Sequence, residues 1–345
     1  MWAQANIQDV EIPSRTAVDE GAFRELVESQ RAEIHAHCYR MLGSLHDADD
    51  ALQDTLVRAW RALPRFRGQS SHRTWLYRIA TNVCLDALAR RPKRVLPIDY
   101  GPALGPGDPA PDMPVADVHW IEPYPDETLG VVDGAAAPEA RYERRESLEL
   151  AFVAALQHLP PRQRAALILR DVLGFSAKEA SKSLDTTVAS VNGALQRARK
   201  TVEERVPERS QQTTLLKLGD RRIRAIVERF ADAFERGEVD AILAMLTEDA
   251  TFGMPPYPGV STGRDAVASS WLMPSGPPPR LRYVATRANG QPALGAYALD
   301  EAGSTYLPIA LDVLTLDGDL IADVTAYRSP SLFARFGLPA EIPRG

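Results

Sequence analysis

The stretch LVRAWRALPRFRGQSSHRTWLYRIATNVCLDALARRPKR, residues 56–94, is strongly basic within a 345-residue chain of formal net charge −6. One acid, Asp86, accompanies ten cations: Arg58, Arg61, Arg65, Arg67, Arg73, Arg78, Arg90, Arg91, Lys93 and Arg94. Aromatic side chains are interleaved at Trp60, Phe66, Trp75 and Tyr77. Cations and flat rings together are what a protein needs to hold a phosphate backbone and stack on opened bases. Charge alone leaves a solvated basic helix face as the alternative.

The pattern of apolar residues predicts that this first region, residues 20–94, is all-α. Apolar side chains recur at helical spacing at positions 26, 34, 38 and 41/42, and again at 52, 56, 59/60 and 63. Aspartates occupy the opposite side of the second stripe. Pro64 ends that helix, and a further helix is expected from about Thr74 to Arg90, where Pro92 stops it.

Residues 95–140 break this pattern. They contain nine prolines and nine acids and no Lys or Arg. Such a composition predicts an extended, poorly helical, acidic linker between two helical regions. A second boundary is expected near residues 203–220, which are polar and include Pro207.

The second region, residues 141–203, is expected to contain a helix-turn-helix. Ser176 and Glu179 have the spacing of a capping box, and Thr186 or Thr187 can cap a last helix from Val188 to about residue 202. Its outward residues are Ser190, Asn192, Gln196, Arg197, Arg199 and Lys200. In the major groove, the amides can contact base edges and the cations can hold phosphates or guanine. An ordinary helical hairpin with a charged outer face is the alternative.

The third region, residues 221–340, predicts an α+β domain with a curved sheet. Two helices, over RRIRAIVERFADAFERGEVDAILAML and GRDAVASSWL, enclose a turn into a strand, and three strand-like runs follow them. The last run contains Asp317-Gly318, a strong hairpin signal between alternating apolar residues.

Composition sets further bounds on the function. Apolar content of 45% and charged content of 25% are ordinary for a soluble globular protein. No run approaches the ~20 apolar residues of a membrane span, and the N-terminus lacks the pattern of a secretion signal. Cys38 and Cys84 have no CxxC spacing, so neither a zinc site nor a disulfide framework is expected. The expected location is the cytoplasm, with no membrane partner, metal or cofactor.

Three segments resemble one known family. DADDALQDTLVRAWRAL, RFRGQSS and RTWLYRIATNVCLDALARR resemble region 2 of extracytoplasmic-function (ECF) sigma factors of the sigma-70 family. LPPRQRAALILRDVLGFSAKEASKSLDTTVASVNGALQRAR resembles region 4 of the same family. WIEPYPD at 120–126, GEVDAILAMLTEDATFGMPP and the closing FARFGLP resemble the SigG- and SigJ-like subgroup, which carries a C-terminal SnoaL-like domain. The resemblance implies two all-α sigma domains, a region 2 helical bundle and a region 4 helix-turn-helix, plus an α+β NTF2-like cone at 221–340.

The resemblance also implies which residues bind which partner. The segment from Asp47 to Trp60 matches the part of region 2 that docks on the β′ clamp helices of core RNA polymerase, while region 4 contacts the β flap. The implied polymerase contacts are Asp47, Asp50, Gln53, Asp54, Arg58 and Trp60.

The loop 65–71 and the helix 74–91 match the segment that recognises the minus-ten promoter element and extrudes a base into a protein pocket. Unstacking costs a few kcal/mol per base, which stacking and phosphate contacts must offset. The candidate contacts are Phe66, Arg67, Ser70, Arg73, Trp75, Tyr77, Arg78, Asn82, Arg90 and Arg91. For Trp75 a place in the core is the alternative.

The helix 187–200 matches the part of region 4 that recognises the minus-thirty-five element. The candidate contacts are Thr187, Ser190, Asn192, Gln196, Arg197, Arg199 and Lys200. Asp185 stands where the family often has a turn glycine, although Asp tolerates left-handed backbone better than most residues. Asn192-Gly193 replaces bulkier or basic residues, which leaves the promoter sequence open.

Cones of this kind have an apolar pocket, and some relatives of the fold are enzymes. All six histidines precede the cone, so a general base there would be Asp312, Asp323 or Tyr306. These residues are more typical of ordinary strand positions, and no catalytic residue is assigned.

The leading interpretation is a sigma factor that binds core polymerase and promoter DNA and is regulated in cis by contact of its C-terminal domain with the sigma domains. The nine acids of the linker beside a basic DNA-binding segment motivate this regulation, because they can screen that segment. A one-component transcription regulator with a ligand-sensing cone is the alternative, and a SnoaL-like isomerase or cyclase is the third class. The segment 47–60 discriminates them, since a simple regulator needs no polymerase-docking helix.

Overall fold

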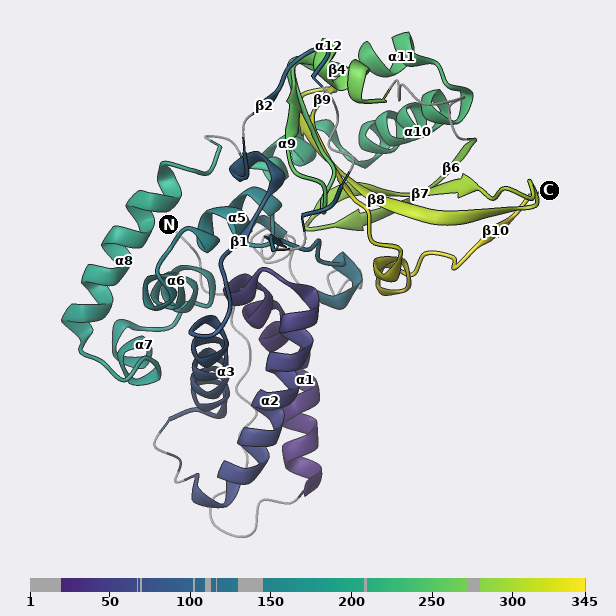
Figure 1. The fold of residues 1–345 in the computed structure, drawn as a ribbon. Coiled ribbons are helices and arrows are strands. Elements are labelled where there is room, and N and C mark those ends of the chain that lie inside the picture. The colour runs from purple at the N-terminus through teal and green to yellow at the C-terminus, as the bar shows by residue number, and fades with distance from the viewer. Residues whose placement is uncertain are drawn as a thin grey trace. The chain divides into compact units, whose positions relative to one another are not determined.

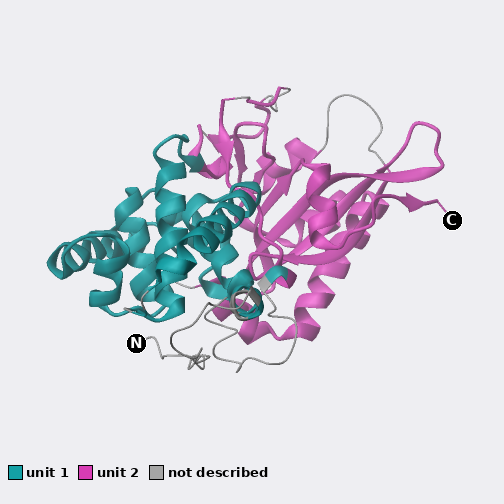
Figure 2. Ribbon diagram, turned by 90° about the horizontal axis from the view of Figure 1, so that it is seen from below, with its two compact units in different colours: residues 1–94, 128–208 teal, residues 95–127, 209–345 magenta. Residues whose placement is uncertain are grey.

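The computed structural model describes residues 20–66, 68, 70–101, 103–108, 113–115, 117–129, 145–207, 210–271 and 280–344. The chain divides into two compact units, coloured separately in Figure 2. Unit 1 comprises residues 1–94 and 128–208, and unit 2 comprises residues 95–127 and 209–345. Each unit is therefore built from two segments that are distant in the sequence.

Unit 1 is entirely helical in its described part. Its helices are α1 (Glu20–Leu42), α2 (Leu45–Ala62), η1 (Leu63–Arg65), α3 (His72–Leu88), α5 (Leu150–Gln157), α6 (Pro161–Leu167), α7 (Ala177–Ser183) and α8 (Val188–Glu203). A π-helical turn over Ile168–Val172 follows α6. The helices expected from periodicity are confirmed, as is the helix-turn-helix formed by α7 and α8.

Polar side chains begin four of these helices. Ser44 and Ser71 accept hydrogen bonds from the third residue of α2 and α3, at 3.1 Å in both cases. Ser176 and Glu179 form the predicted capping box at α7, and Thr187 caps α8 by accepting from the Ser190 amide at 3.1 Å. Each cap satisfies a backbone N–H that has no partner inside its helix and stabilises the helix by about 1 kcal/mol.

The turn between α7 and α8 contains Asp185 in the left-handed region, with φ 49°. The aspartate therefore replaces the usual glycine without changing the helix-turn-helix, as the sequence predicts.

The helices α1, α2 and α3 lie side by side in Figure 1 and share a closely packed core. Ile34, Tyr39 and Met41 of α1 and Leu76 of α3 are fully buried. Burial of such side chains contributes about 1.5–3 kcal/mol each, which offsets the entropy lost on folding.

Unit 2 is an α+β domain built around a large mixed sheet. The strands follow the order β2 (Ala103–Leu104), β5 (Val260–Thr262), β4 (Leu246–Gly253), β9 (Leu320–Tyr327), β8 (Thr305–Asp317), β7 (Gln291–Leu299) and β6 (Leu281–Ala288). The short β10 (Ile342–Pro343) pairs with β8. The pairs β2–β5 and β4–β9 are parallel, and the others are antiparallel. A separate two-stranded sheet joins β1 (Arg94–Val95) and β3 (His119–Trp120).

Two tight turns connect the long strands. The predicted turn at Asp317-Gly318 joins β8 to β9, and Gly318 has φ 56°. Asn289 and Gly290 join β6 to β7 with φ of 55° and 73°, the conformation that an Asn-Gly pair adopts most readily.

One face of this sheet, here called the inner face, packs on helices. These are α10 (Asp220–Arg236), α11 (Val239–Leu243) and α12 (Arg264–Trp271), and Figure 1 shows α10 beside the sheet. Phe230 of α10 is fully buried against Leu294, Leu314 and Val324 of the sheet. The apolar alternation of the strands thus faces the apolar stripe of α10.

A helix occupies part of the segment expected to be a boundary. Residues Gln211–Leu218 form α9, which begins at a Ser210 cap. The buried side chain of Gln211 donates to the Leu316 carbonyl at 2.8 Å and accepts from the Leu316 amide at 2.6 Å. Gln212 donates to the Gly290 carbonyl at 2.9 Å. These polar side chains pair with strand backbone, a pairing that composition does not reveal.

Part of the acidic linker belongs to unit 2, which its composition does not predict. Its residues 95–127 belong to unit 2, where β2 extends the sheet. A Cβ added to Gly253 would lie 2.8 Å from Cβ of Pro97, and one added to Gly259 would lie 2.9 Å from Leu104. Two glycines of the cone domain thus let the linker approach its backbone closely.

Candidate nucleic-acid interface

The outer face of α8 presents the residues predicted to bind the minus-thirty-five element. Thr187, Ser190, Asn192, Gln196, Arg197, Arg199 and Lys200 are all exposed. Val191, Leu195 and Ala198 are buried on the opposite face. The helix therefore presents two amides and three cations to solvent, a chemistry suited to base edges and phosphates.

One of these cations already has a partner. Arg199 makes a bidentate ion pair with Asp171, with N–O distances of 2.8 and 2.7 Å. The hydrogen bonds that Arg199 donates to Asp171 raise the pKa of Arg199, so the guanidinium is held charged and oriented. This ion pair can hold Arg199 in position beside a phosphate. The carboxylate of Asp171 also offsets part of the positive charge that the phosphate would meet.

Several predicted minus-ten residues lie in and around α3. The ring of Phe66 packs at a tilt against the rings of Trp75 and His72, with ring centres 5.1 and 4.7 Å apart. Ser70 and Trp75 are half-buried, while Arg78, Asn82, Arg90 and Arg91 are exposed. Arg67 lies outside the described residues. The aromatic pair at the start of α3 is a platform on which an opened base can stack.

Two predicted minus-ten residues face region 4 of the same unit. Nη2 of Arg73 donates to the Leu173 carbonyl at 2.9 Å, and the guanidinium lies 4.6 Å from the centre of the Phe175 ring. Tyr77 is fully buried and meets Phe175 edge-on at 5.5 Å. Burial raises the pKa of Tyr77, so its hydroxyl stays neutral. In this arrangement neither side chain is free for DNA, and their assignment remains a prediction.

Further contacts join the two sigma segments. Thr74 of α3 donates to Glu179 of the α7 capping box at 3.3 Å. Arg40 of α1 donates to the carbonyl and the hydroxyl of Ser147, at 3.1 and 2.7 Å. The buried guanidinium of Arg164 reaches the carbonyl of Met41. Sequence reasoning missed Arg40 and Arg164, because a lone arginine in a helix is usually a surface residue.

The predicted polymerase-docking residues line one side of α2. Asp50, Gln53, Asp54, Arg58 and Trp60 are exposed. Asp50, Asp54 and Arg58, together with residues of α3, border a groove of about 200 Å³, where Arg58 pairs with Asp86 at 2.9 Å. The exposed acids and Trp60 lie on the surface of α2.

Asp47 differs from its neighbours in this set. It forms ion pairs with Arg91 and, at 2.7 Å, with Arg94, and only 12% of its side chain is exposed. Asp47 therefore anchors the end of the basic stretch to α2, a role that its place in the acidic run does not indicate.

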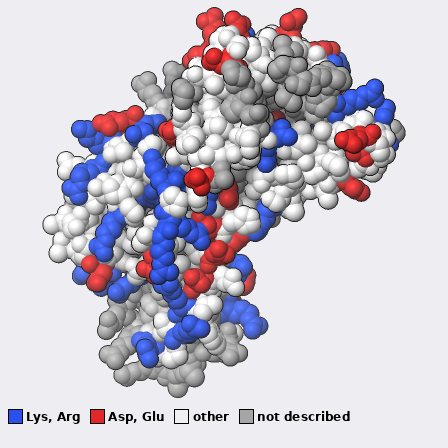
Figure 3. Space-filling model, viewed as in Figure 1, with Lys and Arg blue, Asp and Glu red and all other residues white. Residues whose placement is uncertain are grey.

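Positive charge is spread over much of unit 1. In Figure 3, blue Lys and Arg side chains recur over the part of the unit that carries α3 and α8. This distribution supports contact with a polyanion along more than one helix.

The WIEPYPD motif of the linker binds the Asn-Gly turn of unit 2. The backbone of Tyr124 exchanges hydrogen bonds with Asn289: the Tyr124 amide donates to Oδ1 at 2.7 Å and the Asn289 amide donates to the Tyr124 carbonyl at 2.8 Å. Asp126, only 2% exposed, accepts from the Gly290 amide at 2.7 Å and from Arg287 at 3.2 Å. At least one of the nine linker acids is thus neutralised within unit 2. The sequence signal for this turn is the Asn289-Gly290 dipeptide.

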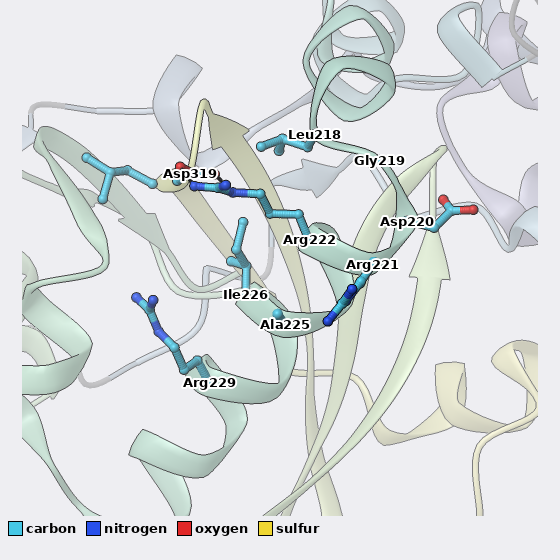
Figure 4. Close-up of a pocket in the computed structure, with 10 residues that line it drawn as sticks. Leu218, Gly219, Asp220, Arg221, Arg222, Ala225, Ile226, Arg229 and Asp319 are labelled. Atoms are coloured by element: carbon cyan, nitrogen blue, oxygen red, sulfur yellow. Dashed lines mark hydrogen bonds and ion pairs between the residues drawn. The ribbon is translucent and has the colours of Figure 1, made fainter.

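A surface cavity of about 790 Å³ lies in unit 2, between the start of α10 and the β8–β9 turn. Figure 4 shows Arg222 directed at Asp319, with which it forms an ion pair, while Arg221 and Arg229 project from the same helix. Its polar groups are solvated or paired, so this cavity contains no buried group that a ligand must satisfy.

The candidate general bases of the cone occupy different environments. Asp323 accepts hydrogen bonds from Thr251 and, at 2.9 Å, from Thr325, which oppose the rise that burial causes in its pKa. Tyr306 lies on β8 opposite Ile342 of β10. Asp312 is buried, and burial raises its pKa to about 7. No cluster of His, Cys, Asp and Glu among the described residues has the arrangement of a metal site.

Comparison with known proteins places these segments in a family. Residues 26–94 match Sigma-70 region 2, residues 149–202 match Sigma-70 region 4, and residues 227–324 match the SnoaL-like domain. The chain is 41% identical over 325 residues to the ECF RNA polymerase sigma factor SigG of Mycobacterium tuberculosis (strain H37Rv), covering 93% of this chain and 85% of SigG. It belongs to the ECF sigma factors.

More distant relatives support the same assignment for the sigma segments. The chain is 29% identical over 188 residues to the sigma-E factor of Escherichia coli K12, which covers 54% of this chain and 88% of that protein. The crystal structure of the ECF sigma factor SigJ of Mycobacterium tuberculosis matches with a TM-score of 0.56 at 20% identity, covering 92% of this chain and 99% of SigJ. SigJ therefore shares the fold.

As an ECF sigma factor, the chain is a non-enzymatic subunit that binds core RNA polymerase and promoter DNA. The alternatives of a one-component regulator and of an isomerase or cyclase are set aside by this membership. Within the described ranges, no helix is long and apolar enough to span a membrane.

Proposed function

We propose that the described form of unit 1 is a closed state of this sigma factor, and that the SnoaL-like domain controls its opening in cis through the linker. The observation that carries the proposal is the engagement of Arg73, a candidate minus-ten contact, with Leu173 and Phe175 of region 4. In unit 1 the Arg73 side chain, which is predicted to bind DNA, instead holds region 2 and region 4 together.

The geometry of a promoter requires these segments to separate. The two elements are centred about 25 base pairs apart, which at about 3.4 Å per base pair is about 80 Å. In unit 1 the first turn of α3 lies within side-chain reach of α7, since Thr74 donates to Glu179. Region 2 and region 4 cannot occupy both elements until this contact opens.

The linker gives the SnoaL-like domain control of that opening. Region 2 ends at Arg94, and the next residues, 95–127, belong to unit 2. These roughly 30 residues, if released and extended, would add about 100 Å to the reach between regions 2 and 4. Docking of the linker therefore limits the separation of the two DNA-binding segments, while its release permits it.

The proposal also assigns the surfaces that bind the β′ and β subunits of core polymerase. The β′ clamp helices bind Asp50, Gln53, Asp54 and Arg58 on the exposed side of α2, and the β flap binds region 4. Asp47 does not contact β′ directly in the closed state; its ion pairs hold Arg91 and Arg94 at the start of the linker.

Run-off transcription with core polymerase tests the proposal. Asp126→Ala removes the buried acceptor of Gly290 and Arg287 and should change promoter-directed transcription severalfold. Glu127→Ala, an exposed acid in the same turn, is the matched control and should leave it unchanged. Truncation after residue 210 deletes the cone domain and should change transcription in the same direction as Asp126→Ala. Equal transcription from the wild type, both point variants and the truncated protein would contradict regulation in cis. The sigma function itself is tested separately, by whether the wild-type protein gives a promoter-directed transcript.

A further inference from the structure

The surface cavity of about 790 Å³ at the start of α10 has an apolar floor. Ala225 and Ile226 of α10 line it, together with Leu218 at the end of α9 and Leu320 at the start of β9. Ala225 is exposed, and both leucines are half-buried. The volume lies within the range of about 300–1,000 Å³ that is typical of small-molecule sites. An apolar group placed on this floor would remove its surface from water, which is favourable.

Arginine side chains surround this floor. Arg222, Ile226 and Arg229 follow one another at intervals of four and three positions along α10, so they form one stripe on the helix surface. In Figure 4 the side chain of Ile226 lies between those two arginines, and Arg221 projects from the first turn of the same helix. All three arginines are exposed. The cavity therefore combines an apolar centre with a cationic rim.

The charges that line the cavity favour a ligand with a single negative charge. Arg222 is already paired with Asp319. Neither Arg221 nor Arg229 forms an ion pair with another described residue, and Asp220 is the second acid of the lining. Three arginines and two aspartates leave the lining with a net charge of +1. A phosphate monoester carries about −1.5 to −2 at neutral pH, whereas a carboxylate carries one negative charge and matches the planar fork of a guanidinium.

We infer that this cavity binds a small amphipathic carboxylate, with its apolar body on the floor and its carboxylate against Arg221 and Arg229. The ion pair of Arg222 with Asp319 joins α10 to the β8–β9 turn and holds two walls of the cavity together. The lining contains no buried polar group, so recognition depends on apolar contact and charge. The site is separate from the interior of the cone, because none of its described lining residues belongs to β4, β6 or β7.

A fluorescent fatty acid tests the inference on the full-length chain. The probe is 11-(dansylamino)undecanoic acid, which is a carboxylate at neutral pH and emits further to the blue in apolar surroundings. We expect saturable binding with a blue shift that weakens as ionic strength rises, because salt screens exposed charges. The methyl ester of the probe has the same apolar body without the charge and should bind about tenfold more weakly.

Variants of the charged residues separate charge from apolar contact. Arg221→Gln and Arg229→Gln should each weaken binding of the acid about threefold to fivefold and leave binding of the ester unchanged. The double variant should bind acid and ester equally. Asp319→Asn frees Arg222 for the ligand and should strengthen binding of the acid. Arg224→Gln removes an exposed charge of the same helix that does not line the cavity, so it should bind as wild type does.

A variant of the floor completes the test. Ala225→Trp fills the cavity with a large side chain and should weaken binding of both the acid and the ester at least about tenfold. Thermal melts verify that each variant is folded. Equal binding of acid and ester by the wild-type chain would overturn the inference, since charge would then play no part. Wild-type binding of the acid by both Ala225→Trp and the double arginine variant would also overturn it, because the probe would then lie elsewhere. These experiments measure binding directly, so their outcome is independent of whether the linker regulates transcription.

Discussion

The guanidinium of Arg73 stacks 4.6 Å from the centre of the Phe175 ring, and its Nη2 donates a 2.9 Å hydrogen bond to the neighbouring Leu173 carbonyl. This relationship joins the first turn of the minus-ten helix α3 to the loop that precedes the helix-turn-helix. If Arg73 binds DNA as the proposed function assigns, a DNA phosphate and the ring of Phe175 compete for one cation. The proposal then requires that binding of promoter DNA and closure of unit 1 exclude each other at this residue.

Arg73→Lys separates these two roles. Lysine keeps the charge for a phosphate but loses the planar stacking and the fixed fork of donors, which weakens the closed state by about 1–2 kcal/mol. We expect faster proteolysis between regions 2 and 4 and a larger radius of gyration by X-ray scattering, with promoter-directed transcription retained. Arg78→Lys, on the exposed side of the same helix, should change neither property. A compact Arg73→Lys protein would show that Arg73 does not hold the unit closed.

Substitutions on α8 distinguish base contacts from phosphate contacts. Asn192→Ala and Gln196→Ala should each cost about 1–3 kcal/mol on the preferred minus-thirty-five sequence and relax the preference at one position. Lys200→Ala should instead weaken binding to all sequences and reduce the salt dependence of binding by about one unit of slope. Binding of promoter variants by holoenzyme across a salt series measures both effects. Glu203→Gln, an exposed residue of the same helix, is the control.

The linker contact at Asp126 is expected to hold residues 95–127 on unit 2. Asp126→Ala leaves the Gly290 amide without its acceptor and Arg287 without its partner, which should cost about 3 kcal/mol. Hydrogen exchange should then become faster in β1, β3 and the WIEPYPD motif, while α1 and α2 keep their protection. Unchanged exchange in Asp126→Ala relative to Glu127→Ala would show that the contact is dispensable.

Asp312 should lower the stability of unit 2 at neutral pH. Its folded-state pKa of about 7 exceeds the unfolded value of about 3.9, so the folded state binds more protons between these values. Stability is then highest at low pH and falls as pH rises from about 4 to about 7, by up to about 4 kcal/mol.

Thermal melts from pH 5 to 8 should therefore show higher stability of Asp312→Asn than of wild type at pH 8, and a smaller difference at pH 5. The comparison between the two proteins is necessary because His37 acts in the opposite direction. Burial lowers the pKa of His37 to about 3, so its contribution is lost as pH falls below about 6.5. A difference between the proteins that does not depend on pH would contradict the assignment.

Much of the DNA-binding face could be predicted from local sequence. The periodicity of Val191, Leu195 and Ala198 places Asn192 and Gln196 on the outer side of α8, and the caps at Ser176 and Thr187 set the ends of both helices. These features depend on residues within one or two turns of each other. The contact of Arg73 with Phe175 joins residues about a hundred positions apart, and no local pattern encodes such a pairing.

For the linker, too, the local sequence predicts the conformation of the segment but not its tertiary contacts. Its prolines and acids predict an extended linker without a long helix, and the described part contains none, but composition alone does not predict that the linker docks on the sheet. Docking depends on Gly253, Gly259 and the Asn289-Gly290 turn, which bring open backbone to the linker only when the sheet is folded.

The sequence by itself determined the class of the protein, because helical periodicity, caps and two long sigma motifs are carried by neighbouring residues. It also determined which side chains of α8 face solvent. Only the tertiary structure decided that regions 2 and 4 pack together through Arg73, that part of the linker belongs to unit 2, and that Asp312 is buried with no partner for its Oδ1 among the described residues. The physical reason is that burial and hydrogen-bond partners depend on chain segments far apart in sequence, which meet only after folding.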